Sequence, residues 1–346
     1  MGFLGLKWKN MIEIDCSNYE EGGQILRTAF ALSAITKKDC RVFNMGKTGL
    51  TPQNLLVIQS LAKICKGKIE GDKLGSEEVR FFPEELIQNQ PIINIKIEAA
   101  NSITLALQTL VLPALFISHP LKIIFEGGAT DTFFSPTIDY FQQVLLKILE
   151  MMNLKTEICV KKRGYYPEGG GELEATIHPS KLKGMHLIER GSLKKIKALS
   201  GASESLKDKK VAERQLAGVR EVLGKLKLPI EEKIEYYNTL CPGSQICLVA
   251  EFENTVIGTD NLGKLGKRAE DIGKEAALEL LKESKTNACL DKHSTEQILP
   301  YLALASVKSQ VSVSEITDSC RTNIQVIEKF LKGNFEIKGN LITWIP

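Results

Sequence analysis

The feature that most constrains the fold is the alternation of strand-like and helix-like segments along the chain, with glycine pairs at the turns between them. Residues 12–15 alternate apolar and charged side chains, as a strand does, and a helix-like stretch follows the glycine pair at 22. Glycine pairs recur at 127 and 169, where other strand-like segments end or begin. The pattern predicts an α/β (α+β) protein of repeated two-layer units, each with a sheet packed on helices.

The remaining segments follow the same periodicities. We predict helices over residues 53–66, 102–116, 136–152, 211–227, 267–282, 298–305 and 322–332. We predict strands over residues 68–70, 79–82, 92–97, 121–125, 155–160, 172–177, 232–236 and 245–252, and a hairpin over 335–344.

A chain of 346 residues is long for one compact core, so the sequence predicts two domains. Residues 185–280 begin with a lysine-rich stretch, are bounded by polar segments, and are predicted to form an inserted small α/β domain. Residues 1–184 and 281–346 would then form a large domain built of the repeats.

Composition narrows the class of protein and its compartment. The 43% hydrophobic and 25% charged content is typical of globular proteins, and a net charge of +3 permits an RNA partner without requiring one. The eight cysteines contain no CxxC pair, so no zinc ligand set is recognisable. The absence of a signal sequence and of an apolar run of about 18 residues predicts a cytoplasmic protein without membrane contact. Cysteine redox state and homo-oligomer formation stay open.

The most specific local motif is RGYYPEGGGEL at residues 163–173. Three successive glycines expose backbone N–H groups and adopt positive φ without steric cost, so this loop can approach a phosphate or another backbone closely. For the glycines alone, a tight turn between two strands is the simpler interpretation.

With Arg163 and Pro167 in place, the loop matches Arg-Gly-x-x-Pro-x-Gly-Gly-Gly, and the chain resembles the RNA 3'-terminal phosphate cyclase family. Further matches follow the family's order along nearly the whole chain: Asp15, Glu20, residues 22–27, 49–50, 53–55, Gln108, residues 126–128, 135–136, 293–297 and 322–324. Collinear matches are far more specific than one glycine motif. The chain is therefore identified as a member of this family.

The resemblance implies an ATP-dependent reaction at an RNA 3'-phosphate end. In the family a histidine attacks the α-phosphate of ATP, AMP passes to the RNA end, and the neighbouring 2'-hydroxyl displaces AMP to leave a 2',3'-cyclic phosphate. The implied ligands are ATP, an RNA with a 3'-phosphate and Mg²⁺ or Mn²⁺. The resemblance assigns these roles: Glu20 as catalytic carboxylate and metal ligand, Glu296 as a second metal carboxylate, Gln24 and the catalytic Arg27 facing phosphates, and Gln108, His293, Ser294, Thr295, Glu296 and Gln297 holding the nucleotide.

Each residue also has a structural interpretation. Glu20 would suit the positive end of a helix dipole, and Arg27 would suit a solvated helix face. Gln108 would need a partner in an apolar helix, and His293 would cap or pack before the helix that follows it.

Three departures from the family pattern cluster at the phosphate-transfer residues. Ser319 occupies the position of the nucleophilic histidine, and a serine hydroxyl needs a neighbouring base that the sequence does not identify. Cys320 is adjacent but should point to another face. Lys47 stands in a shorter loop that is arginine-rich in relatives, and Glu21 replaces a glycine beside the proposed metal site.

Two hypotheses of different classes follow. The first is a cyclase or related RNA-end adenylylating enzyme that uses Ser319, Cys320 or His293 in an altered mechanism. The second is a non-catalytic RNA-binding relative acting in RNA processing or ribosome assembly. A third alternative is group transfer on a small metabolite.

Overall fold

The computed structural model describes residues 11–17, 22–88, 90–226 and 228–346. Three units of the same order, β-α-β-α-β-β, follow one another along the chain. The first comprises β1 Ile12–Asp15, α1 Gly22–Thr36, β2 Cys40–Phe43, α2 Pro52–Cys65, β3 Lys68–Glu70 and β4 Glu78–Phe82.

The second unit comprises β5 Ile92–Ser102, α3 Ile103–Ala114, β6 Leu121–Ala129, α4 Ile138–Tyr140 continued by α5 Leu146–Met151, β7 Thr156–Lys162 and β8 Glu172–Ile177. The third comprises β9 His186–Leu187, α8 Lys292–Leu304, β14 Ser309–Ser312, α9 Asp318–Phe330, β15 Asn334–Lys338 and β16 Leu341–Ile345.

All three sheets have the same topology. Their strand orders are β1-β2-β4-β3, β5-β6-β8-β7 and β9-β14-β16-β15, so in each unit the first two strands are neighbours and the last strand lies inside the third. The first pair is parallel and the others are antiparallel in every unit. The predicted repeat of two-layer units is therefore confirmed, although the side chains at equivalent positions differ.

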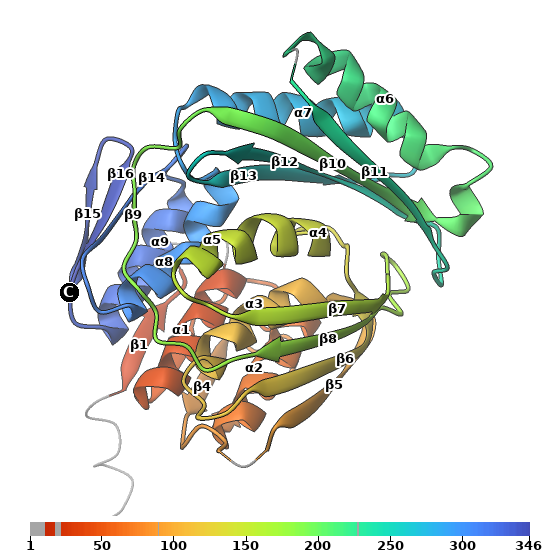
Figure 1. Cartoon of the computed structure of the whole chain (residues 1–346). Coiled ribbons are helices and arrows are strands. Elements are labelled where there is room, and N and C mark those ends of the chain that lie inside the picture. The colour runs from red at the N-terminus through yellow and green to blue at the C-terminus, as the bar shows by residue number, and fades with distance from the viewer. Residues whose placement is uncertain (1–10, 18–21, 89, 227) are drawn as a thin grey trace, which may run out of the picture.

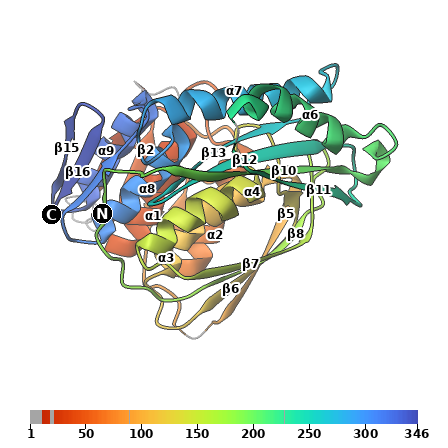
Figure 2. The ribbon, with the colours of Figure 1, turned by 45° about the horizontal axis from the view of Figure 1, so that its top comes forward.

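A fourth sheet interrupts the third unit between β9 and α8. It has the order β11-β10-β12-β13, from β10 Leu193–Ser203, β11 Ile230–Tyr237, β12 Ser244–Phe252 and β13 Val256–Leu262. Helices α6 Val211–Leu223 and α7 Ala269–Lys285 cover one face, and α4 lies on the other side (Figures 1 and 2). The division of the chain into two domains at 185 and 280 stays a prediction.

Glycines set the distance between α6 and α7. A Cβ atom at Gly218 would lie 2.0 Å from the Glu270 carbonyl oxygen, and one at Gly273 would lie 1.9 Å from the Gln215 carbonyl oxygen. The two helix backbones are therefore in contact, and a larger side chain at either position would separate them. The sheet and these helices enclose a hydrophobic cluster of their own, distinct from the large cluster of the three units.

The predicted helix over residues 136–152 has an irregular middle. A π-helical turn, Phe141–Leu145, separates α4 from α5. At Gly258 of β13 a Cβ atom would lie 2.4 Å from Val144 Cγ2, so this turn packs Val144 directly on the sheet backbone. Such π turns are frequent near functional sites, because they shift the side chains that follow.

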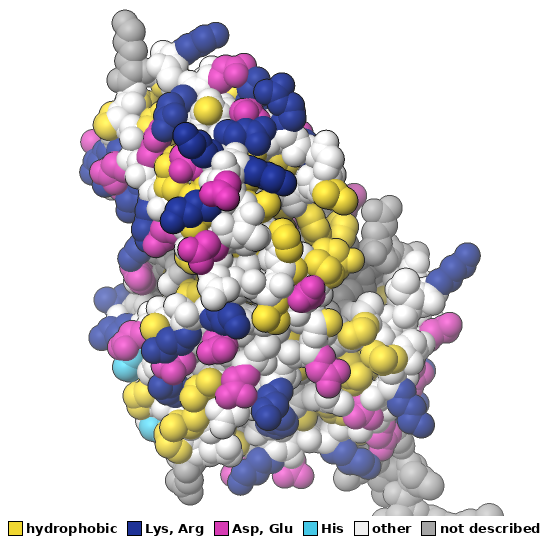
Figure 3. All heavy atoms as spheres, turned by 90° about the vertical axis from the view of Figure 1, so that its right-hand side faces the viewer, with side chains coloured by type: hydrophobic (Ala, Val, Ile, Leu, Met, Phe, Trp, Pro, Cys, Tyr) yellow, Lys and Arg dark blue, Asp and Glu magenta, His cyan; other side chains and the backbone are white. Residues whose placement is uncertain are grey.

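The exposed surface mixes both signs of charge. On the face in Figure 3, Lys and Arg side chains are interspersed with Asp and Glu, and hydrophobic side chains are exposed between them. No helix in the described ranges has the length and apolar character needed to cross a membrane.

Candidate active site

A cavity of about 1050 Å³ opens where helices of the first, second and third units meet. Its walls come from α1, α3, α8, α9 and the segment before α4. Seven residues predicted for the site line it together: Gln24, Arg27, Gln108, His293, Glu296, Gln297 and Ser319. Residues almost 300 positions apart in sequence are thus gathered by the packing of α1 against α9 and of α9 against α8. Glu20 and Glu21 lie outside the described residues.

Ser319 lies on the first turn of α9 and contacts α1. Its hydroxyl donates a hydrogen bond to Gln24 Oε1 at 3.0 Å. An amide oxygen accepts a hydrogen bond but does not remove a proton at neutral pH, so this contact orients Ser319 without activating it.

The neighbouring Cys320 is not a substitute nucleophile. Its side chain is fully buried, and desolvation raises the pKa of its thiol to about 12. Because the thiolate is the reactive form, Cys320 stays unreactive near neutral pH. The prediction that Cys320 points away from Ser319 is therefore confirmed.

Arg27 is held at the cavity wall by α2. Its guanidinium donates to Asn54 Oδ1 at 2.9 Å. Asn54 is fixed in turn, because its N–H bonds to the hydroxyl of Thr51, which caps α2. This arrangement presents one cation at the α1 side of the cavity, whereas Lys47 does not line it.

The segment at residues 293–297 lies in the first turns of α8, and only part of it faces the cavity. Asp291 caps the helix and accepts bonds from the N–H groups of His293 and Ser294. The hydroxyls of Ser294 and Thr295 donate to the Asp291 carbonyl oxygen, and both side chains are fully buried. Ser294 and Thr295 therefore stabilise the helix start and do not line the cavity.

Two buried oxygens on the cavity wall have no hydrogen-bond partner among the residues that the structure describes. Asn323 is 3% exposed and its Nδ2 donates to the Glu296 carbonyl oxygen at 2.9 Å, which leaves its Oδ1 unpaired. Gln297 Oε1 is also buried and unpaired. An unpaired buried acceptor costs free energy, so both oxygens favour a ligand that donates hydrogen bonds or carries positive charge. Nearby, the Glu296 carboxylate accepts a hydrogen bond from Thr317.

The sequence did not identify several residues of this cavity. Lys282, Lys292 and Arg321 add positive charge to its wall. Asp260, from β13 of the inserted sheet, also lines it; its carboxylate accepts from the Thr137 N–H at 2.7 Å, and burial raises its pKa. No local pattern marks these residues, because they meet only through tertiary packing.

The glycine loop at 163–171 has a structural role. A Cβ atom at Gly169 would lie 2.3 Å from the Ala99 carbonyl oxygen, and one at Gly164 would lie 2.5 Å from that of Gly128. The sequence allowed this loop to approach either a phosphate or another backbone closely. In the structure it closely approaches another backbone.

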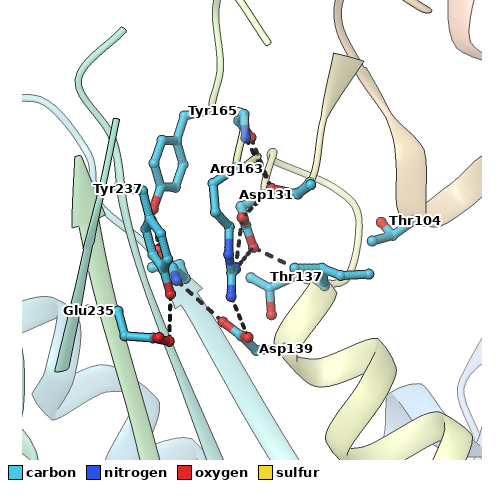
Figure 4. Close-up of polar contacts among 12 residues, drawn as sticks. Thr104, Asp131, Thr137, Asp139, Arg163, Tyr165, Glu235 and Tyr237 are labelled. Atoms are coloured by element: carbon cyan, nitrogen blue, oxygen red, sulfur yellow. Dashed lines mark hydrogen bonds and ion pairs between the residues drawn. The ribbon is translucent and has the colours of Figure 1, made fainter. Parts of the chain in front are cut away.

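Arg163, at the start of this loop, is buried between two carboxylates. It donates to Asp131 at 3.0 Å and to Asp139 at 2.5 Å, and its side chain is 7% exposed (Figure 4). The Tyr237 ring lies 4.9 Å from the guanidinium carbon, and Gln245 of β12 donates to Asp139. The cluster thus connects the inserted sheet to the second unit. Burial lowers the pKa of Arg163, but Asp131 and Asp139 outweigh this effect and raise the pKa, so the guanidinium stays charged.

Comparison with known proteins identifies the family of this chain. The sequence profile of the RNA 3'-terminal phosphate cyclase family matches residues 18–337. The chain is 40% identical over 335 residues to an RNA 3'-terminal phosphate cyclase of Sulfurisphaera tokodaii, covering 95% of this chain and 96% of that one. It is 41% identical over 336 residues to the protein of that name from Pyrococcus furiosus, covering 96% of each chain. This chain belongs to the RNA 3'-terminal phosphate cyclase family.

Proposed function

We propose that this protein converts the 3'-phosphate end of an RNA to a 2',3'-cyclic phosphate with ATP, and that it does so in the cytoplasm. The observation that carries the proposal is the single cavity in which Gln24, Arg27, Gln108, Glu296 and Gln297 meet. Relatives about 40% identical over nearly the whole chain are named for this activity.

The cavity offers complementary groups for a nucleotide and a phosphorylated RNA end. Arg27, Lys282 and Arg321 are cations at its wall, and positive charge favours the phosphoryl oxygens on which negative charge gathers during transfer. The unpaired oxygens of Gln297 and Asn323 would accept hydrogen bonds from ribose hydroxyls or from an amino group of the base.

A divalent cation, Mg²⁺ or Mn²⁺, fits this chemistry as a partner of the phosphates. No three His, Cys, Asp or Glu side chains within the described ranges form a metal-binding group. Magnesium commonly binds through one or two carboxylates plus substrate phosphates, which the Glu296 carboxylate would satisfy, with Glu20 as a second ligand. When bound, the cation would neutralise charge on the phosphoryl oxygens.

We further propose that AMP passes directly to the RNA, because a serine stands where the resemblance places the nucleophilic histidine and Cys320 is buried as a thiol. An oxygen of the RNA 3'-phosphate would attack the α-phosphorus of ATP and release pyrophosphate. The neighbouring 2'-hydroxyl would then attack the 3'-phosphorus, lose its proton and release AMP. Neither step requires a bond between AMP and the protein.

Incubation with α-labelled ATP, Mg²⁺ and an RNA 3'-phosphate tests both parts. We expect phosphatase-resistant cyclic ends that depend on ATP, and no label on the protein in a denaturing gel. Cyclic ends together with acid-labile label on the protein would contradict direct transfer but not the cyclase activity. The label would then point to His293 as the nucleophile. No cyclic ends, together with salt-sensitive RNA binding, would contradict the enzyme and favour the non-catalytic RNA-binding alternative.

A further inference from the structure

Phe134 is an exposed aromatic residue with an unusual backbone conformation at the edge of the cavity. Its relative exposure is 103%, and its φ is 60°. A bulky residue in the left-handed region is uncommon and costs free energy, and such strain tends to persist at functional sites. No ring contact within the described part of the chain offsets this cost for Phe134. The segment therefore keeps an apolar ring in solvent at a cost in stability.

Phe133, the chain neighbour of Phe134, contacts further aromatic and cationic side chains. The Phe133 ring makes an edge contact with the Tyr166 ring at 5.9 Å between centroids, and Lys264 Nζ lies 5.7 Å from the Phe133 centroid. Tyr166 is 59% exposed, and Lys264 is exposed and makes no ion pair with any described residue. We call Phe133, Phe134, Tyr166 and Lys264 the aromatic rim.

The tightly packed glycine loop carries Tyr166 of the aromatic rim. Tyr166 belongs to the loop at residues 163–171. The backbone of this loop lies so close to the carbonyl groups of Ala99 and Gly128 that no side chain fits between them. Lys264 lies in the turn after β13, the strand that also brings Asp260 to the cavity. The rim thus combines three rings and a cation from three segments of the chain.

The rim is continuous with the cavity, because Phe134 lines it together with Ser135 and Pro136. A substrate that enters with its reacting end would leave the rest of its chain at this mouth. Exposed rings stack on unpaired bases of any sequence, and a nearby cation attracts the phosphates between them. A nucleic acid strand therefore suits the rim better than an apolar protein surface does, because Lys264 would have to be desolvated under a protein.

We propose that the aromatic rim binds single-stranded RNA, with a base next to the reacting end stacked on Phe134 and a backbone phosphate near Lys264. The direction of the strand rests on the proposed function, since it assumes that the 3' end occupies the cavity. The stacking contact itself does not depend on turnover.

The test compares wild-type protein with Phe134→Gly in binding a 3'-phosphorylated single-stranded RNA of about 12 nucleotides, within the usual site sizes of single-strand-binding folds. Glycine adopts φ near +60° without strain, so this variant keeps the backbone and should unfold at a temperature no lower than wild type does. We expect its Kd for RNA to rise about tenfold at fixed salt. Phe116→Ala, which removes an exposed ring elsewhere, is the matched control and should leave the Kd unchanged.

A second measurement places the contact on the RNA. Abasic nucleotides introduced one at a time should weaken wild-type binding about tenfold at one position near the 3' end, and removal of that base should cost Phe134→Gly nothing further. Unchanged RNA affinity in Phe134→Gly would overturn the proposal. The proposal would also be overturned if Phe134→Gly bound ATP more weakly and RNA as tightly as wild type does, because the adenine would then stack on the ring. It would likewise be overturned if the wild type were a dimer that Phe134→Gly failed to form, with RNA affinity unchanged.

These outcomes are separable from failure of the proposed function. If wild-type protein forms no cyclic ends but shows the abasic-dependent contact with Phe134, the cyclase proposal fails and the aromatic rim stands. If cyclic ends form normally and Phe134→Gly binds RNA like wild type, the rim fails and the cyclase proposal stands.

Discussion

Ser319 of α9 donates a hydrogen bond to Gln24 of α1 across the cavity wall, with 3.0 Å between Oγ and Oε1. The contact links the residue that the resemblance places at the nucleophilic position to one that the resemblance expects to face phosphates.

The first prediction concerns this pair. We expect Ser319→Ala to retain cyclisation within a few-fold of wild type, because direct transfer does not use the hydroxyl as a nucleophile. Ser319→His should acquire acid-labile label from α-labelled ATP, since an imidazole would then face the same cavity. A loss of activity in Ser319→Ala of about 10³-fold or more, as for removal of a catalytic nucleophile, would contradict direct transfer.

The second prediction concerns the buried cluster in Figure 4. Arg163→Ala leaves Asp131 and Asp139 without their cation in a buried site. Removal of one partner from a buried ion pair costs about 3–5 kcal/mol, so we expect a loss of that size in the free energy of unfolding in urea. The control is Arg220→Ala, which breaks the more exposed pair with Glu232 and should cost about 1 kcal/mol or less. Equal losses in both variants would refute the structural role of Arg163.

The third prediction concerns pH and the contact between α6 and α7. Two hydrogen bonds from Arg214 lower the pKa of Glu270 to about 2, from a usual value of 4.5. A lowered folded-state pKa means that this pair stabilises the protein above about pH 4.5 and loses its effect as the pH falls towards about 2.

The melting temperature of Glu270→Gln should therefore lie below that of wild type at neutral pH, and the difference should shrink in this acidic range. Glu204→Gln, at an exposed position with no ion pair among the described residues, should show no such difference. A difference between Glu270→Gln and wild type that is independent of pH would show that the effect is not electrostatic.

Much of the fold followed from periodicity. The predicted helix over 53–66 corresponds to α2, and the hairpin over 335–344 to β15 and β16. Strand β10 was missed because Lys194, Lys195 and Lys197 flank Ile196, so the lysine-rich composition obscured a period of two. The fourth sheet, which depends on β10, was therefore incompletely predicted.

The site was predictable only where the family motifs include it. His293, Glu296 and Gln297 lie on one face of α8, whereas Ser294 and Thr295 point to its buried side, as a period of 3.6 residues requires. The prediction that all five residues at 293–297 hold the nucleotide did not take this helical period into account. Asp260 was missed because it reaches the cavity from the inserted sheet, through packing that no local pattern records.

The most direct test of the central claim is single-turnover cyclisation of an RNA 3'-phosphate by wild type, Gln297→Ala and the exposed control Gln88→Ala. Loss of one hydrogen bond to the nucleotide corresponds to about a tenfold fall in rate. The account predicts that wild type and Gln88→Ala form cyclic ends at the same rate and that Gln297→Ala is about tenfold slower. Equal rates in all three proteins would contradict it.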